Sequence, residues 1–189
     1  MRWQVKQVKM SKTLLLHICC APCSLLSLRV FQESGYSILG YFFNPNIHPY
    51  REFVRRKETL RGFLEKEEIP YVIDEGYPLE EFLEMTRPFG KDRCRRCYSL
   101  RLEAAARLAQ EKGIGYFSSS LLISPYQKHE QIRELGEELA DRYGLKFVYE
   151  DLRPFFRESL RLAREREFYI QGYCGCIFSE KERYAKSKK

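Results

Sequence analysis

Short apolar runs alternate along this chain with longer segments that have the pattern of helices. The apolar runs are rich in branched and aromatic residues, and five of them are candidate strands, at residues 12–20, 36–43, 70–74, 114–122 and 145–151. Each is followed by a segment with helical spacing or strong helix formers. This order predicts an α/β fold with an open, mostly parallel, doubly wound sheet and crossover helices.

Start and stop signals support the helical segments. In APCSLLSLRVFQESG, Pro22 falls in the expected first turn and Gly35 lies beyond the expected end. A second segment, KHEQIRELGEELADRYG, stops at Gly144. The stretch CRRCYSLRLEAAARLAQEKG at 94–113 is rich in strong helix formers, so its two cysteines are expected at or just before the first turn.

The chain is predicted to form a single domain. Its 189 residues and 44% hydrophobic content suit one globular core, and no repeat or low-complexity linker interrupts the pattern. We expect four parts: an N-terminal extension at 1–11, the α/β core at 12–152, a C-terminal helix and CGC loop at 153–178, and a basic tail at 179–189.

No apolar run reaches the length of a membrane span, and the start of the chain does not read as a secretory signal. We therefore expect a cytoplasmic protein with no membrane partner. Thiols stay reduced in that compartment, so clustered cysteines there indicate metal binding or redox chemistry and not disulfides.

All seven cysteines fall into three groups. These are ICCAPC with Cys19, Cys20 and Cys23, CRRC with Cys94 and Cys97, and CGC with Cys174 and Cys176. Thiolates suit zinc, iron–sulfur clusters and copper. One zinc ion or one four-iron cluster occupies four thiols and leaves three, which could hold a second metal with an open position or act as redox thiols.

The first group lies at the carboxyl end of the first expected strand. Open parallel sheets build their sites at that edge, so we expect the other two groups to converge there. The serines at 118–120 and the SPYQ segment at 124–127 would face the same crevice, or would simply end a strand and cap a helix. Cys23 is expected in the first turn of a helix, whose partial positive charge stabilises a thiolate. The arginines around the CRRC pair would act in the same way.

The net charge of +7 and the pI of about 9.0 favour a polyanionic partner, of which nucleic acid is the foremost example. Arg55 and Arg56 lie among glutamates, so a solvated helix face is an equally good interpretation for them. No glycine-rich phosphate loop follows a strand, which disfavours chemistry dependent on ATP or NAD.

The remaining candidates for chemistry are few. His17 lies in an apolar strand and is expected to be a hydrogen-bonded core histidine. His48 and His129 are expected at the surface or facing a substrate. Asp92, beside the CRRC pair, and Tyr126 are the candidate proton donors because of where they lie.

Four segments together resemble one known family. LLLHICCAPCS, CRRCYSLRLEAAARLA, FSSSLLISPYQ and GYCGC are similar to the cobalamin-independent epoxyqueuosine reductase family, QueH, and the resemblance runs from about residue 13 to 178. It implies an enzyme of tRNA modification that removes the epoxide oxygen of epoxyqueuosine at wobble position 34 to leave queuosine. It also implies a Rossmann-like fold similar to the adenine-nucleotide alpha hydrolase group.

The resemblance further implies a [4Fe-4S] cluster, an additional mononuclear iron and an external electron donor. Four of six cysteines would bind the cluster, and the other two would lie nearest the second iron together with Cys23. The six are Cys19, Cys20, Cys94, Cys97, Cys174 and Cys176.

For tRNA, we expect a set of arginines and the tail to neutralise phosphates of the anticodon stem, while Tyr126 or Tyr173 stacks on loop bases. The arginines are Arg93, Arg95, Arg96, Arg55 and Arg56. Two alternatives stay open: an iron–sulfur tRNA sulfur-transfer enzyme, which usually needs an ATP loop, and a non-catalytic, zinc-stabilised RNA-binding module.

Overall fold

The computed structural model describes residues 12–185. The expected N-terminal extension at 1–11 and the last four residues of the expected tail lie outside the described part of the chain. Among the described residues, no helix is both long and apolar enough to cross a bilayer.

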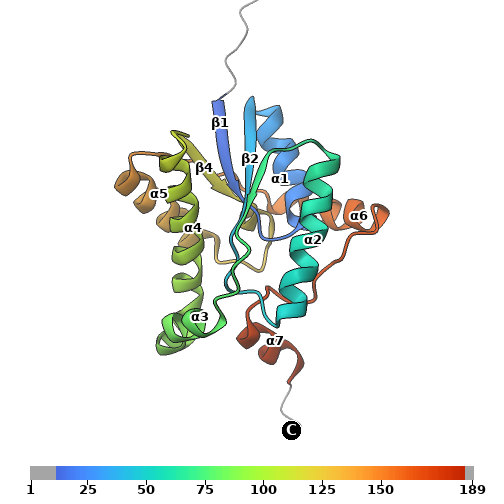
Figure 1. The fold of residues 1–189 in the computed structure, drawn as a ribbon, viewed down its shortest axis with the longest axis vertical. Coiled ribbons are helices and arrows are strands. Elements are labelled where there is room, and N and C mark those ends of the chain that lie inside the picture. The colour runs from blue at the N-terminus through green and yellow to red at the C-terminus, as the bar shows by residue number, and fades with distance from the viewer. Residues whose placement is uncertain (1–11, 186–189) are drawn as a thin grey trace, which may run out of the picture.

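Five parallel strands form one sheet in the order β3-β2-β1-β4-β5 (Figure 1). The order runs outward from β1 in both directions, so the connection between β3 and β4 crosses back over the sheet. This confirms the predicted doubly wound architecture and puts a topological switch point between β1 and β4. The strands are β1 Lys12–His17, β2 Tyr36–Phe42, β3 Tyr71–Ile73, β4 Tyr116–Ser119 and β5 Lys146–Phe147.

Helices cover both faces of the sheet, with α4 and α5 on one side and α1, α2 and α6 on the other (Figure 1). The helices are α1 Ala21–Glu33, α2 Tyr50–Lys66, α3 Leu79–Thr86, α4 Arg93–Glu111, α5 His129–Tyr143, α6 Phe156–Glu165 and α7 Ile177–Tyr184. Three short 3₁₀ helices are η1 Arg87–Asp92, η2 Ser120–Ile123 and η3 Arg153–Phe155.

The core lies on both sides of β1. Leu14, Leu15 and Leu16 are fully buried in succession, as expected for a parallel strand covered by helices on both faces. The predicted helix signals are confirmed, since Pro22 lies in the first turn of α1 and Gly144 ends α5 in the left-handed conformation.

Three predicted strands were too long. The fourth ends at Ser119 and not at residue 122, because the Ser119 hydroxyl accepts a hydrogen bond from the Leu121 amide and starts η2. The first ends at His17 and not at residue 20, and the fifth covers only Lys146–Phe147 of the predicted 145–151.

Part of the expected basic tail is helical. It continues through Tyr184 in α7, which has Glu180 in its first turn and Arg183 in its last, an arrangement that suits the helix dipole.

Candidate metal centre and active site

The first thiol group lies at the switch point of the sheet. Cys19 follows β1, Cys20 is the N-cap of α1, and Cys23 lies in the first turn of that helix. All three Sγ atoms lie within 4.8 Å of one another, and those of Cys19 and Cys20 are 3.7 Å apart. Three buried thiols at this separation can bind one metal ion and leave a coordination position open.

The second set of thiols comes from two distant elements. The first turn of α4 presents Cys94 and Cys97, and the loop before α7 presents Cys174 and Cys176. All four line one small cavity together with Arg101. The helix start predicted for the CRRC segment is confirmed, and the small cavity is lined by four thiols, the number of ligands that a four-iron cluster takes.

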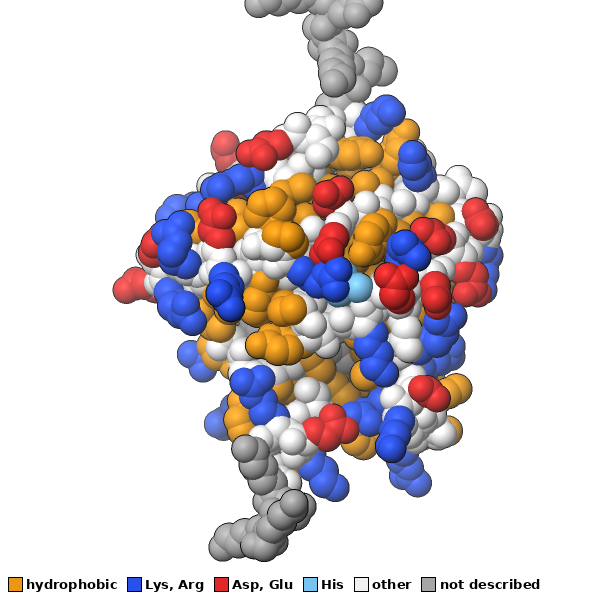
Figure 2. Space-filling view, turned by 180° about the vertical axis from the view of Figure 1, so that it is seen from behind, with side chains coloured by type: hydrophobic (Ala, Val, Ile, Leu, Met, Phe, Trp, Pro, Cys, Tyr) orange, Lys and Arg blue, Asp and Glu red, His pale blue; other side chains and the backbone are white. Residues whose placement is uncertain are grey.

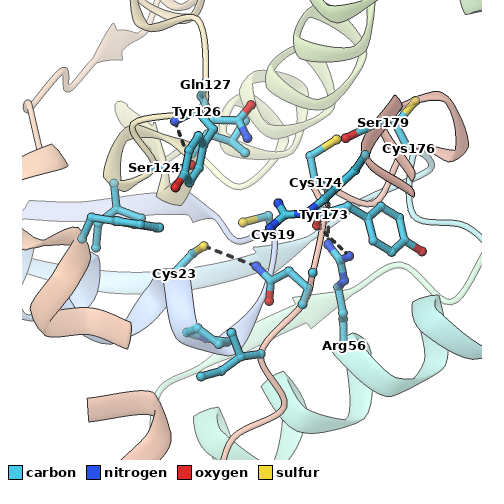
Figure 3. A pocket seen from close by; sticks show the side chains of 18 of the residues that line it. Cys19, Cys23, Arg56, Ser124, Tyr126, Gln127, Tyr173, Cys174, Cys176 and Ser179 are labelled. Carbon is cyan, nitrogen blue, oxygen red and sulfur yellow. Dashed lines mark hydrogen bonds between the residues drawn. The ribbon is translucent and has the colours of Figure 1, made fainter. Parts of the chain in front are cut away.

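A larger cavity of about 610 Å³ joins the two sets. In Figure 3, Cys19 and Cys23 enter it from the start of α1, whereas Cys174 and Cys176 enter from the C-terminal loop. The structure thus brings together the three cysteine groups, which are separated by about seventy residues or more in the sequence.

The CGC loop is held by α2. Arg56 donates hydrogen bonds of 3.1 Å to the carbonyl oxygens of Tyr173 and Cys174, and it pairs with Glu52 at 2.6 Å. Its side chain is only 2% exposed. Arg56 was predicted to contact phosphate, but this burial assigns it to positioning two thiols.

The other predicted phosphate contacts do not form one open patch. Arg55 stacks over the Tyr169 ring with its guanidinium carbon 3.8 Å from the centroid. Arg93 pairs with Glu182, and Arg95 pairs with Glu134 at 3.0 Å. Arg96 forms no ion pair with any residue from 12 to 185, and its buried Nε has no partner there. Figure 2 shows one face of the molecule, on which basic and acidic side chains are intermixed.

The two candidate proton donors differ in position. Asp92 is the exposed N-cap of α4 and does not line the large cavity. Tyr126 lines the cavity wall with its side chain 81% exposed, and its ring packs edge-on against Phe156. Tyr173, expected to stack on bases, is partly exposed and also lines the cavity, and its hydroxyl donates to the His48 carbonyl.

The thiols differ in acidity because of their surroundings. Hydrogen bonds from the thiols of Cys20 and Cys23, and from the Ser120 hydroxyl, hold the pKa of Cys19 well below its usual value. Hydrogen bonding to Cys19 and Cys20, together with burial, raises the pKa of Cys23, so the predicted thiolate at the helix start falls on Cys19 instead. Burial raises the pKa of Cys97 to about 12. This effect of burial is larger than the opposite effect of positive charge, which comes from Arg101.

The sequence predicted the environment of one of the three histidines correctly. His17 is a core residue, as expected: its Nε2 donates to the Phe43 carbonyl at 3.1 Å, and its Nδ1 lies 2.9 Å from the Ser119 hydroxyl. Burial lowers the pKa of His17 to about 4, so the ring is neutral near pH 7. His48 and His129 are buried and neither at the surface nor in the cavity wall as predicted. The His48 ring packs against Phe82, and His129, the first residue of α5, places its Nε2 3.1 Å from the Ser124 carbonyl.

Two residues of the site were missed in the sequence. Gln171 donates its amide to Cys20 Sγ at 2.9 Å, and nothing in the sequence distinguishes it from other loop residues. Arg101 lies one helical turn after Cys97, so helix spacing could have found it. Ser120, expected to face the crevice, lines neither cavity and is fully buried, because its hydroxyl binds the amide and the thiol of Cys19.

This fold and site define a cysteine-rich, doubly wound α/β protein with the donor set of a metal-cluster enzyme. A family model described as epoxyqueuosine reductase QueH matches residues 14–182. The chain belongs to the QueH family of epoxyqueuosine reductases, which are oxidoreductases of tRNA modification.

Two curated relatives are similar in sequence to this chain over most of their own length. The epoxyqueuosine reductase QueH of Dehalococcoides mccartyi is 38% identical over 177 residues, which cover 94% of this chain and 97% of that protein. The QueH of Acinetobacter baylyi is also 38% identical over 177 residues, covering 88% and 79%.

A solved structure shows the same fold in a more distant protein. The U34-tRNA thiolase NcsA from Methanococcus maripaludis, solved with its [4Fe-4S] cluster, aligns with a TM-score of 0.57 and 17% identity. The alignment covers 86% of this chain and 59% of that one. At this identity the likeness concerns the fold alone, and it agrees with the predicted doubly wound α/β architecture.

Proposed function

We propose that this chain removes the epoxide oxygen of epoxyqueuosine at wobble position 34 of a tRNA. Two C–O bonds break, a C=C bond forms, and the oxygen leaves as water after the substrate takes up two electrons and two protons. The observation that carries the proposal is the gathering of seven thiols in a member of this family, five of which line one open cavity while Cys20 and Cys97 lie beside them.

The thiol donor set fits the metals that this reaction needs. We assign the [4Fe-4S] cluster to the thiols that line the smaller cavity, Cys94, Cys97, Cys174 and Cys176. The triad of Cys19, Cys20 and Cys23 remains for a mononuclear iron, since its three Sγ atoms are close enough to share one ion. When bound, these groups supply single electrons and a Lewis-acidic position.

The protein supplies binding and protons around that centre. The large cavity is big enough for a modified base, and Ser124, Tyr126 and Gln127 form a polar part of its wall. Gln127 is held by the Tyr98 hydroxyl, which donates to its Oε1 at 2.8 Å. We assign proton donation to Tyr126 before Asp92, because only Tyr126 lines the cavity.

The partners follow from this assignment. The substrate is a tRNA, and the two electrons come from an external one-electron donor. A cytoplasmic location fits both, because that compartment holds the tRNA and keeps the thiols reduced.

The direct test is to measure iron, zinc and acid-labile sulfide on protein purified without oxygen, followed by an assay on tRNA that carries epoxyqueuosine. We expect about five irons and four sulfides per chain, and a nucleoside product that has lost one oxygen atom. One zinc with no sulfide would support the RNA-binding module. A product that has gained sulfur would support the sulfur-transfer enzyme.

Binding of the tRNA is expected to weaken as salt rises, because phosphate contacts release counterions. Replacing Arg96 by glutamine should reduce the slope of log affinity against log salt by between about 0.7 and 0.9, the value for one contact. Arg107→Gln, at an exposed site near the other end of α4, should leave the slope unchanged. Equal slopes for the wild type and Arg96→Gln would remove Arg96 from the interface.

A further inference from the structure

Arg101 is a buried cation beside the thiols. It lies on α4 one turn after Cys97, and the residue is only 4% exposed. Its Nε donates to the Cys97 carbonyl at 3.3 Å, and the side chain lines the same small cavity as the four thiols assigned to the cluster. The guanidinium is thus built into the wall of the thiol site.

Arg101 has no carboxylate partner among the described residues, unlike the other buried arginine and lysine side chains. Within residues 12–185, the other two buried basic residues pair with carboxylates, Arg56 with Glu52 and Lys57 with Glu75. Arg101 forms no ion pair with any described carboxylate. The groups that interact with its charge include the thiols of Cys97, Cys19 and Cys174.

A buried charge without a counter-charge is unfavourable, so such residues are retained where an anion neutralises them. The anion here must come from the thiols or from a group bound to them. Four thiolates around a four-iron cluster leave a net negative charge, and reduction by one electron adds to it. A fixed cation beside such a centre favours the reduced form more than the oxidised form.

We propose that Arg101 is a positioning residue that supplies the counter-charge for the thiolate-bound cluster and raises its reduction potential. The inference rests on the proposed function, which places a cluster at these thiols. The step it affects is the transfer of one electron from the external donor to the cluster, in which no bond of the protein forms or breaks.

The test is a redox titration of the loaded protein followed by EPR, with Arg101→Met and Arg101→Lys compared with the wild type. Arg101→Met should disfavour reduction about tenfold, a shift of about 59 mV to lower potential for one electron. Arg101→Lys, which keeps the charge, should recover most of that shift. Arg107→Gln on the same helix should have the wild-type potential.

Thermal unfolding of the metal-free protein separates this role from a purely structural one. Without the cluster, Arg101→Met should be at least as stable as the wild type, because an apolar side chain replaces an unpaired buried charge. The same variant should retain less iron after loading. An unchanged potential, or equal destabilisation of the metal-free and loaded forms, would overturn the inference for Arg101 alone. A wild-type chain that holds no cluster would overturn both the inference and the proposed function.

Discussion

Replacing Cys97 by alanine is expected to abolish reduction of epoxyqueuosine and to release iron from the protein. Cys97 is buried in the first turn of α4 and lines the small cavity with three other thiols. Alanine has no donor atom, and the other thiol on α4, Cys94, is itself assigned to the cluster. Because the missing ligand opens the centre, we expect activity to fall by at least a hundredfold.

The measurement is iron and sulfide per chain after anaerobic reconstitution, together with turnover on the modified tRNA. Ser99→Ala is the matched control, since Ser99 lies on the same helix and does not line either cavity. Circular dichroism should show the same helix content for both variants. Full activity with unchanged iron in Cys97→Ala would remove this residue from the proposed ligands.

Replacing Gly175 by alanine should displace the CGC loop and have the second largest effect. Gly175 has a φ of +116°, which side chains rarely adopt, and an added Cβ would lie 2.9 Å from Ile47 and 3.2 Å from the guanidinium of Arg56. Strain of this kind costs about 1–3 kcal/mol. The loop can relieve it only by moving Cys174 and Cys176, so iron content and turnover should fall together, by more than tenfold for turnover.

Gly35→Ala is a matched control for backbone strain. Gly35 also has a positive φ, +87°, but it follows α1 at the opposite end of that helix from the thiols, and nothing lies within 4 Å of an added Cβ. It should lower the melting temperature without changing iron content. If Gly175→Ala retains full iron and wild-type turnover, the loop does not require its observed position.

The effect of Gly175 illustrates how the site is supported. The thiols of the CGC loop depend on Arg56 from α2 and on the His48 amide, which donates to the Gly175 carbonyl at 2.8 Å. The loop therefore takes its position from residues more than a hundred positions earlier in the chain. Substitutions at these supports should act through the thiols and not through substrate contacts.

The sequence by itself determined the architecture. Alternating apolar runs and helical segments lead to a parallel sheet, because strands joined through helices must run in the same direction. It also placed the first thiol group at the site edge of the sheet, since ICCAPC follows the first strand and such sheets build their sites there. The convergence of the other two groups was an expectation that depended on tertiary packing. Glycine and proline signals predicted helix ends, because those residues restrict or free the local backbone.

Only the tertiary structure decided which side chains face the site and which charges are paired. Local pattern cannot distinguish the buried Arg56 from the neighbouring Arg55, because burial depends on a loop that arrives from the far end of the chain. The burial of His48 and the contact of Gln171 with Cys20 have the same origin. Secondary structure follows from short-range preferences, whereas the environment of a side chain is set by segments distant in sequence that pack around it.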